Sequence, residues 1–413
     1  MPKDLSILVL TTSFPVKSSM AVGIHIIEKC RHLVKKGVNV KVIAPHHVGS
    51  KTTEIRDGII IKRFRYFFPT KWQQIAYGAG IPTNLMNSWL ARFQLPFFML
   101  AFLVCAVNNS RHIDIIHCHW SIAGLIGVIA AKLFKKKVVL MVHGAEVFVL
   151  GKNPILRFVL KHVDCSISNS TFTEKKTHEV YPSKHSVVIP PGVDINRFYH
   201  QARIANLRHN LNIAAGDIFV LAIGKFIPRK GFEYLIEAFN HIVHQRKITN
   251  MKLRIGGRGP LRSKYEQMID QYSLGDYIGF LEYIKDEDIP SYYSEADIFV
   301  LPSIVDERGD TEGLGVVFLE ANACRTPVIG SKVGGILDVI KDGANGFYVQ
   351  QKNSMDLAEK IMRLSDEKEL RDKMGENGRK LVEEQFNWET LANKIIDVYN
   401  SLLYKKLLSI RES

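Results

Sequence analysis

Residues 310–320 read Asp-Thr-Glu-Gly-Leu-Gly-Val-Val-Phe-Leu-Glu, a short loop that runs into an apolar helical stretch. Gly313 and Gly315 stand just before the predicted helix. Glycines at such a point let backbone amides approach a ligand closely, and a helix start carries partial positive charge that suits phosphate. We expect Glu312 in the loop and Glu320 more than a turn inside the helix. The two carboxylates suit sugar hydroxyls on either side of a diphosphate, although a capped helix with one surface glutamate also accounts for this segment alone.

A second segment, residues 223–231 (Ile-Gly-Lys-Phe-Ile-Pro-Arg-Lys-Gly), follows a predicted strand and opens another helix. It brings Lys225, Arg229 and Lys230 to the carboxyl end of that strand. The helix dipole disfavours cations at a helix start. Their placement there is understandable if an anion lies between them.

Short runs rich in valine and isoleucine recur along the chain and predict strands. They are residues 7–10, 40–44, 59–64, 113–119, 138–143 and 187–190 in the first half, and 218–223, 252–256, 278–281, 298–302, 327–330 and 346–349 in the second. Helical spacing separates several of them, as in residues 24–36 and 122–134. Near-continuous apolar strands that alternate with helices are typical of parallel sheets covered on both faces. The predicted fold class is α/β, with two doubly wound parallel-sheet domains.

The join between the two domains is expected at Pro190-Pro191-Gly192-Val193-Asp194, because tandem prolines stiffen a connection and the glycine permits a sharp turn. We expect an N-terminal domain over residues 1–192, a C-terminal domain over 193–385, and a final helix within 386–413 that packs back on the N-terminal domain. Ligands bind beyond the carboxyl ends of strands in such sheets. Two facing sheets would therefore place one site in the cleft between them.

The composition describes a globular chain whose positive charge is concentrated in its first half. Its 413 residues are 46% hydrophobic and 23% charged, which excludes disorder and small disulfide-stapled scaffolds. The formal charge is +14, but residues 1–200 carry 26 basic and 10 acidic side chains, whereas residues 201–413 carry 29 and 31. A basic surface attracts polyanions, so nucleic acid, anionic lipid and phosphorylated small molecules are all open at this point.

The cysteines and the apolar segments indicate a cytoplasmic protein. Five cysteines without a C-x-x-C pair argue against a disulfide framework and favour a reducing compartment. The first apolar run, residues 7–10, is too short for the core of a signal peptide. Residues 90–107 are the nearest to a membrane span, but Arg92, Gln94 and Pro96 interrupt them, so we expect a buried or half-buried helix.

The common nucleotide-binding fingerprints are missing from the sequence. There is no G-x-x-x-x-G-K-[ST] motif, which argues against a P-loop ATPase or GTPase. Residues 257–262 (Gly-Arg-Gly-Pro-Leu-Arg) have arginine where a dinucleotide fingerprint has its third glycine. We therefore discount NAD and expect a tight strand-to-helix turn.

Several further motifs stand in a fixed order around the glutamate pair. They are Ala321, Cys324, Pro327-Val328-Ile329, Val333-Gly334-Gly335-Ile336, Asp342-Gly343, Asn345-Gly346-Phe347, the Gly224 to Gly231 segment, Pro191-Gly192-Val193-Asp194 with Phe198, Asp297-Ile298-Phe299-Val300-Leu301-Pro302-Ser303, and His117-Cys118-His119-Trp120 with His143-Gly144. Together with the E-x7-E element, Glu312 to Glu320, they cover almost the whole chain. In this order the sequence resembles the family-four glycosyltransferases, retaining enzymes of the GT-B fold that use sugar nucleotides. The resemblance implies two facing Rossmann-like domains and a role in cell-surface polysaccharide or glycolipid synthesis.

The resemblance also assigns roles to residues on the donor side. It implies that Lys225 and Lys230 bind the diphosphate, with Arg229 sharing that grip, and that Glu320 binds the nucleotide ribose. It implies that Glu312 holds the transferred sugar. The donor-binding loop beside it is expected to contribute Gly313, Leu314 and Gly315.

On the N-terminal side, the resemblance implies that Gly23 approaches the diphosphate and that His143 reaches the reacting sugar. Glu312, His143 and Lys230 are thus the expected catalytic residues. His119 is expected to line the acceptor pocket. Both Gly23 and His143 also have simple structural interpretations, as a turn glycine and a strand-end histidine.

A nucleoside diphosphate departs as an anion whose charge must be stabilised. Cations and helix dipoles are expected to do this, so we predict no obligatory metal or other cofactor. A metal site at His117-Cys118-His119 is not expected, because adjacent strand residues point to opposite faces. For the family, retention is explained by front-face attack of the acceptor hydroxyl.

The donor base and sugar stay open, with UDP- or GDP-sugars expected. Lys225 stands where the family usually has arginine, and lysine is a point charge without the bidentate fork of arginine, which is why Arg229 is expected to share the diphosphate grip. Arg258 occupies a place where an acidic residue is common, and Glu282 one where glycine is common. The departures at Arg258 and Glu282 fall on the region expected to recognise the base.

Basic and aromatic residues interleave between residues 63 and 102, a pattern that suits a membrane interface. We therefore expect a glycan or lipid-linked acceptor and peripheral binding to the inner face of the cytoplasmic membrane; aromatic side chains buried in a core explain the pattern equally well. A sugar-nucleotide epimerase or binding protein of the same fold is an alternative. No nucleic-acid recognition motif is present, so no nucleic-acid partner is expected.

Overall fold

The computed structural model describes residues 5–16, 23–78, 80–148, 153–183, 185–200, 204 and 206–404. The chain divides into two compact units, Met1–Pro191 with Trp388–Ser413, and Gly192–Asn387. The sequence-based boundaries were placed after residues 192 and 385. Residues 1–4, on which the prediction about export partly rests, lie outside the described residues.

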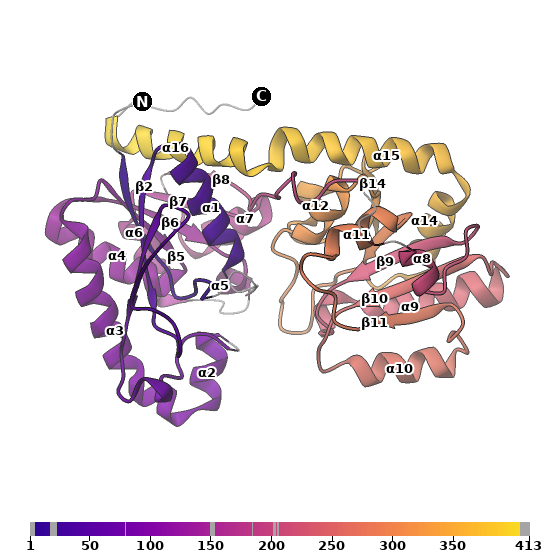
Figure 1. The fold of residues 1–413 in the computed structure, drawn as a ribbon, viewed down its shortest axis with the longest axis horizontal. Coiled ribbons are helices and arrows are strands. Elements are labelled where there is room, and N and C mark those ends of the chain that lie inside the picture. The colour runs from indigo at the N-terminus through magenta and orange to yellow at the C-terminus, as the bar shows by residue number, and fades with distance from the viewer. Residues whose placement is uncertain are drawn as a thin grey trace. The chain divides into compact units, whose positions relative to one another are not determined.

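The first unit is built on an eight-stranded sheet (Figure 1). Its strands are β1 (Ser6–Leu10), β2 (Asn39–Pro45), β3 (Thr53–Arg56), β4 (Ile59–Phe64), β5 (Ile115–His119), β6 (Lys137–Val142), β7 (Cys165–Ser168) and β8 (Ser186–Val188). Its helices are α1 (Ile24–Lys35), α2 (Ile81–Asn87), α3 (Trp89–Ser110), α4 (Ser121–Phe134), α5 (Ala145–Phe148), α6 (Pro154–His162), α7 (Thr171–Val180) and α16 (Trp388–Tyr404), with a 3-10 turn η1 (Thr70–Trp72).

The strand order of the first sheet is β3-β4-β2-β1-β5-β6-β7-β8, and every pair is parallel except β3 with β4. Helices α1 and α16 cover one face, and α3, α4 and α6 cover the other (Figure 1). Helix α16 is fastened there by the Tyr399 hydroxyl, 2.6 Å from Nδ1 of His117, and by an ion pair from Lys36 to Glu389. The direction of winding reverses between β1 and β5, which is where open α/β sheets bind ligands.

The second unit has a six-stranded parallel sheet of order β11-β10-β9-β12-β13-β14. Its strands are β9 (Ile218–Ile223), β10 (Met251–Gly256), β11 (Ile278–Leu281), β12 (Ile298–Leu301), β13 (Val328–Ser331) and β14 (Gly346–Val349). Its helices are α8 (Leu207–Asn210), α9 (Phe232–Asn240), α10 (Arg262–Gln271), α11 (Ile289–Glu295), α12 (Val316–Ala323), α13 (Ile336–Val339), α14 (Ser354–Asp366) and α15 (Lys368–Leu381), with short 3-10 or π turns η2 (Pro228–Lys230), η3 (His241–Gln245) and η4 (Val382–Phe386). Winding reverses between β9 and β12.

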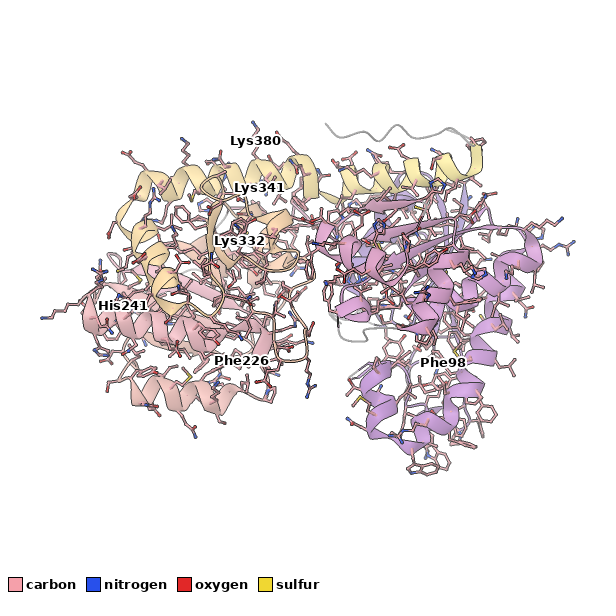
Figure 2. The ribbon with its side chains drawn as sticks, turned by 180° about the vertical axis from the view of Figure 1, so that it is seen from behind. Phe98, Phe226, His241, Lys332, Lys341 and Lys380 are labelled. Atoms are coloured by element: carbon pink, nitrogen blue, oxygen red, sulfur yellow. The ribbon has the colours of Figure 1, made fainter. Side chains whose placement is uncertain are left out.

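The two units thus confirm the α/β class and the two parallel-sheet domains. Each has its own apolar core, in which Phe98 of the first unit and Phe226 of the second are fully buried (Figure 2). The valine- and isoleucine-rich runs form strands because both faces of these sheets are covered. Two strands were not predicted: β3 is an exposed antiparallel edge, and β7 contains two serines and a single isoleucine.

Helix α3 is half-buried, as its sequence predicts. Its buried stripe consists of Ala91, Gln94, Phe98, Phe102, Ala106 and Ser110. Its length and composition alone would allow it to cross a membrane, but 28% of its most apolar 18-residue stretch is buried inside the protein. Pro96 lies inside it without ending it.

Candidate active site

The second unit gathers charged side chains at the carboxyl end of its central strands. Lys225, Arg229 and Lys230 follow β9, and Ser303 follows β12. Glu312 lies in the loop that leads from β12 to α12. Because parallel strands end at one edge of the sheet, segments about 80 residues apart converge there.

Glu312 is the centre of this cluster. Its Oε2 lies 2.6 Å from Nζ of Lys230 and 2.9 Å from Nη1 of Arg229. It also accepts a hydrogen bond of 3.3 Å from Oγ of Ser303. Nε of Arg229 pairs in addition with Asp310 at 3.2 Å. The anion that was expected between the cations is therefore, in this state, a carboxylate of the protein.

The electrostatics of this cluster keep Glu312 ionised. Burial opposes its charge, but Lys230 and Arg229 outweigh burial and lower the pKa of Glu312 to about 2. Burial lowers the pKa of Lys230 in turn, against the attraction of Glu312. The side chains of Lys230 and Glu312 are only 8% and 12% exposed, so solvent screens the pair weakly.

Two glycines let the loops approach this closely. Gly231 has a φ of +64°, and a Cβ there would lie 2.1 Å from the carbonyl oxygen of Pro302. Gly334 has a φ of +55°, and its Cβ would lie 2.3 Å from the carbonyl oxygen of Glu312. Any larger residue would push the Lys230 and Glu312 segments out of place.

Glu320 occupies a different setting from Glu312. It lies inside α12, as predicted, and its Oε2 accepts a hydrogen bond of 3.0 Å from the Tyr293 hydroxyl. Burial raises the pKa of Glu320 to about 7, although the tyrosine opposes this shift. The two glutamates of the E-x7-E element are thus not equivalent, since Lys230 and Arg229 outweigh burial at Glu312, whereas burial outweighs the tyrosine hydroxyl and Arg197 at Glu320.

The remaining donor-side residues flank the cluster. Gly315 has a φ of +85° and directly precedes α12, Gly313 is partly exposed, and Leu314 is buried. Lys225 is exposed, and no ion pair to it occurs within the described chain. Its charge nevertheless acts on Lys230.

The first unit gathers histidines at the corresponding edge of its sheet. Gly23 precedes α1, His119 ends β5, and His143 follows β6. Nδ1 of His119 lies 3.1 Å from Nε2 of His143. His25 contacts the His143 ring at a centroid distance of 5.2 Å, and the indole of Trp120 stacks on it at 4.3 Å.

A buried carboxyl group holds the His143 segment. Oε1 of Glu146 accepts a hydrogen bond of 3.0 Å from the His143 amide, and Oε2 accepts one of 2.8 Å from the Ser121 amide. Burial raises the pKa of Glu146 to about 7. This residue was missed from the sequence, although its position three residues after His143 was a signal.

The histidine cluster is uncharged at neutral pH. Burial holds the pKa values of His117, His119 and His143 well below the usual 6.5. Burial also lowers the pKa of Lys29 to about 8, and its Nζ finds no hydrogen-bond partner among the described residues. At neutral pH the histidines are therefore uncharged, whereas Lys29 keeps most of its positive charge.

One placement differs from expectation. His119 was expected to line an acceptor pocket, but it has no exposed surface, because it packs beneath His143 at the end of a central strand. His143 is 7% exposed, so of these two histidines it is the one that can be reached from outside. Tyr293, His25 and Lys29 were not singled out from the sequence, and Ser303 was named only as the end of a motif, because no local pattern shows that these side chains lie at the two sites.

Nowhere in the part of the chain that the structure describes do three histidine, cysteine, aspartate or glutamate side chains group so that they could hold a metal ion. His117 and His119 lie on the same face of β5 and stack at 5.0 Å.

Comparison with known proteins identifies the families to which the two units belong. Residues 22–197 match the Glycosyltransferase Family 4 model, and residues 203–381 match the model for glycosyl transferases group 1. The N-acetyl-alpha-D-glucosaminyl L-malate synthase of Bacillus anthracis is 29% identical over 325 residues, 76% of this chain and 81% of that protein. The GDP-mannose-dependent alpha-(1-6)-phosphatidylinositol monomannoside mannosyltransferase of Mycobacterium tuberculosis is 29% identical over 63% of this chain and 69% of that protein.

Solved structures agree on the fold. The sucrose-phosphate synthase of Thermosynechococcus elongatus superimposes with a TM-score of 0.77 at 24% identity, over 97% of this chain and all of that one. Anabaena HepE in complex with UDP superimposes with a TM-score of 0.75 at 18% identity, over 96% of this chain and all of that one. The chain is therefore a glycosyltransferase of the GT-B fold, with a family 4 domain followed by a group 1 domain.

Proposed function

We propose that this enzyme transfers a hexose-type sugar, with retention of configuration, from a nucleotide-diphosphate sugar to a hydroxyl of a glycan or lipid-linked acceptor. The observation that carries the proposal is the buried cluster of Lys230 and Arg229 around Glu312. The stability of the fold alone does not explain such a cluster, because burying a charged side chain costs several kcal/mol per ion before it is paired. The enzyme would act in cell-surface polysaccharide or glycolipid synthesis.

In the proposed reaction, the bond between the anomeric carbon and the diphosphate oxygen breaks, and its electron pair leaves with the nucleoside diphosphate. The acceptor oxygen forms the new bond to the anomeric carbon, and its proton passes to the departing phosphate oxygen on the same face. Lys230 and Arg229 stabilise the negative charge that develops on the diphosphate. Glu312, ionised at all ordinary pH values, accepts hydrogen bonds from the sugar hydroxyls.

Glu320 would hold the ribose hydroxyls of the nucleotide, and His143 would contact the transferred sugar. Lys225 adds a third cation for the diphosphate. Since these cations supply the positive charge, we expect transfer to proceed in excess EDTA. Transfer that strictly requires an added divalent ion would contradict this part of the proposal.

One experiment can identify the donor. A thermal-shift screen of UDP-, GDP- and ADP-sugars identifies it, because a ligand that binds only the folded protein raises its melting temperature. The Mycobacterium tuberculosis relative is named for GDP-mannose, and Anabaena HepE was solved with UDP, so these two donors come first. Nuclear magnetic resonance of the product then gives its anomeric configuration. Epimerised or merely released nucleotide, without sugar on any acceptor, would favour a sugar-nucleotide epimerase or binding protein instead.

The proposed place of action is the inner face of the cytoplasmic membrane, and helix α3 supports it. Its exposed stripe consists of Trp89, Phe93, Phe97, Leu100 and Val104, of which Trp89 is 76% and Leu100 62% exposed. Phe67, from the loop after β4, touches Phe93 and Phe97 at centroid distances of 6.3 and 6.0 Å and widens the patch. Apolar patches of this kind mark interaction surfaces.

The charge around the patch favours an anionic bilayer as its partner. Residues 58–113 contain six basic and no acidic side chains, and Arg65, Lys71 and Arg92 among them are exposed. Basic residues beside aromatic ones suit the headgroup region, at about 1 kcal/mol per basic residue. Because Phe98 and Phe102 on the opposite side pack in the core, the helix would lie on the membrane and not cross it.

Co-sedimentation with vesicles tests this location. We expect binding to vesicles that contain phosphatidylglycerol, weaker binding to neutral phosphatidylcholine, and loss of binding in a Phe93→Ser, Phe97→Ser double variant. Met355→Ser, at an exposed apolar residue of the second unit, is the matched control and should bind like the unaltered protein. Absence of binding to both vesicle types at every salt concentration would exclude a peripheral membrane role.

A further inference from the structure

The first unit contains a cavity of about 330 Å³ that has no part in the cluster around His143. It lies where β2 ends, and three segments line it: the loop after β2, the turn before α2, and the junction of α2 with α3. The lining residues are His46, His47, Val48, Gln73, Gln74, Ala76, Tyr77, Gly78, Asn84, Asn87 and Ser88. A cavity of this size accommodates a sugar ring or a similar small group.

The walls of the cavity are held by their own hydrogen bonds. Nε2 of Gln73 lies 3.0 Å from Nδ1 of His46, and Oε1 of Gln73 accepts a bond of 3.0 Å from the Tyr66 amide. Nδ2 of Asn84 donates to the carbonyl oxygens of Ile75 and Tyr77, at 3.0 and 2.9 Å. The cavity is therefore formed before any ligand binds, which lowers the entropic cost of binding.

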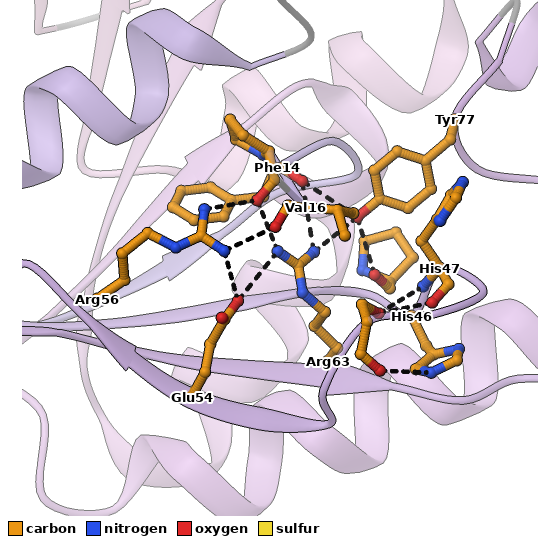
Figure 3. A network of polar contacts seen from close by, with 11 residues as sticks. Phe14, Val16, His46, His47, Glu54, Arg56, Arg63 and Tyr77 are labelled. Carbon is orange, nitrogen blue, oxygen red and sulfur yellow. Dashed lines mark hydrogen bonds and ion pairs between the residues drawn. The ribbon is translucent and has the colours of Figure 1, made fainter. Parts of the chain in front are cut away.

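A buried arginine outside the lining supports one wall of the cavity. Nη1 of Arg63 donates to the Tyr77 hydroxyl at 2.9 Å, and Nη2 donates to the carbonyl oxygen of Pro15 at 2.7 Å (Figure 3). The Tyr77 hydroxyl donates in turn to the carbonyl oxygen of Pro45 at 2.9 Å. Glu54 lies 3.5 Å from the same guanidinium and 2.9 Å from that of Arg56, so one carboxylate is shared by two arginines. The Arg63 guanidinium lies behind the tyrosine and is not part of the lining.

The lining chemistry suits one class of ligand. The lining includes no carboxylate, lysine or arginine. Burial lowers the pKa of His46, so its imidazole is neutral at pH 7. Amide, imidazole and hydroxyl groups both donate and accept hydrogen bonds, as a sugar hydroxyl does, whereas phosphate or an amine calls for opposite charge.

We infer that this cavity binds the uncharged, hydroxyl-rich part of the acceptor, and this inference rests on the proposed glycosyl transfer. The cavity lies at the same edge of the sheet as Gly23 and His143, since β2 neighbours β1. Ser88 belongs to the cavity lining and also caps α3, with its Oγ accepting from the Ala91 amide at 3.2 Å. The exposed apolar stripe of α3 starts at the very next residue, Trp89.

The cavity and the apolar stripe of α3 are adjacent, so they can bind the polar and the apolar part of one amphipathic acceptor. A hydroxyl-rich headgroup in the cavity leaves its lipid on the side of the apolar stripe. Both features sit on one helix and its cap, so their spacing is fixed by the fold. The cavity therefore defines the acceptor as a glycan or polyol carried on a lipid.

Ligand-observed saturation-transfer magnetic resonance tests the inference with defined probes. The probes are methyl α-D-mannopyranoside, methyl β-D-glucopyranoside and myo-inositol, with inorganic phosphate as competitor. We expect a signal from at least one probe with the unaltered protein, no displacement by phosphate, and at least a fivefold loss in Asn87→Leu. Asn87 is an exposed lining residue at the end of α2, and no hydrogen bond of its side chain occurs within the described chain, so the fold should be retained.

The matched control is Asn108→Leu, another exposed asparagine, located on α3 away from the cavity, which should bind the probe normally. Equal binding in the two variants, displacement of the probes by phosphate, or no signal from any probe would overturn the inference. Donor binding separates this outcome from failure of the proposed function. Asn87→Leu should keep the thermal shift with the donor nucleotide sugar, whereas absence of any such shift in the unaltered protein would contradict the glycosyl-transfer proposal and leave the cavity result standing.

Discussion

The two units place their polar residues at the same position in similar sheets and use opposite chemistry there. At the end of β9 and β12, the second unit buries a carboxylate between two cations within 2.9 Å. At the end of β5 and β6, the first unit buries histidines whose pKa values lie well below 6.5, beside Lys29, whose pKa burial lowers to about 8. One site is built from paired charges, and the other from neutral histidines beside a buried lysine that is mostly protonated at pH 7.

The difference fits the two substrates that we propose. A diphosphate carries charge in the ground state and gains more on leaving, so its site needs cations, and buried cations are stabilised by a carboxylate partner. A sugar or polyol acceptor carries no charge, so neutral donors and acceptors suffice.

The strongest test of the charged site is Lys230→Ala. We expect kcat to fall by about 10² to 10³-fold, because the developing charge on the diphosphate loses a buried cation. The measurement is transfer of labelled sugar at saturating donor. Lys225→Ala, which removes an exposed cation, should cost less, and Lys373→Ala on α15 should change nothing. Full activity in Lys230→Ala would remove Lys230 from the catalytic assignment.

Glu312→Gln tests the pairing itself through stability. The pKa of Glu312 is lowered from 4.5 to about 2, so its ionised form stabilises the fold above pH 4.5, and this contribution disappears as the pH falls toward 2. We expect the variant to be less stable by about 3 kcal/mol at pH 7. The gap should close on acidification, as thermal melts at pH 7, 5 and 3 can show. A gap that is the same at all three values would contradict the pairing.

Lys29→Met tests whether the first unit carries a buried positive charge at a cost in stability. The pKa of Lys29 is lowered from 10.5 to about 8, so its protonation disfavours the folded state below pH 8, and the penalty vanishes as the pH rises to 10.5. We expect the variant to gain on the order of 2 kcal/mol at pH 7 and nothing near pH 10.5. Lys35→Met, exposed on the same helix, is the control. A gain that does not depend on pH would argue for simple packing.

Tyr293→Phe should have the smallest effect. The Tyr293 hydroxyl favours the ionised form of Glu320, whose pKa is about 7, so its removal should raise that pKa further. We expect the KM for the donor to rise severalfold at pH 7, with kcat little changed, and to recover above pH 8. Measuring the donor KM against pH checks this. An unchanged profile would show that Glu320 does not act on the donor in its ionised form.

Much of the fold follows from local pattern. The strands at residues 59–64, 218–223, 278–281 and 346–349 begin and end at the predicted residues, because covered parallel strands are continuously apolar. The helix after Gly315 starts at Val316, with Glu320 inside it, as its sequence predicts. Strand β3 escaped prediction because an exposed edge needs no apolar run.

The site was predicted less completely, and for a physical reason. Motif order identifies Glu312, Lys230 and His143, but the direct ion pair of Glu312 with Lys230 joins positions 82 residues apart. No local sequence pattern predicts that Glu312 and Lys230 form an ion pair, or that His119 is buried beneath His143. The cavity beside His46 combines segments from three parts of the first unit and has no sequence signature.

Local sequence thus accounts for the class of the fold, its two sheets, the family to which the chain belongs and the positive charge of its first half, because periodicity, composition and motif spacing are properties of neighbouring residues. Burial and convergence belong to the folded chain. Packing decides which charges are paired, which histidines stay neutral, which side of α3 faces outward, and where a cavity is left. Those features depend on contacts between distant segments, and they set the chemistry of each site.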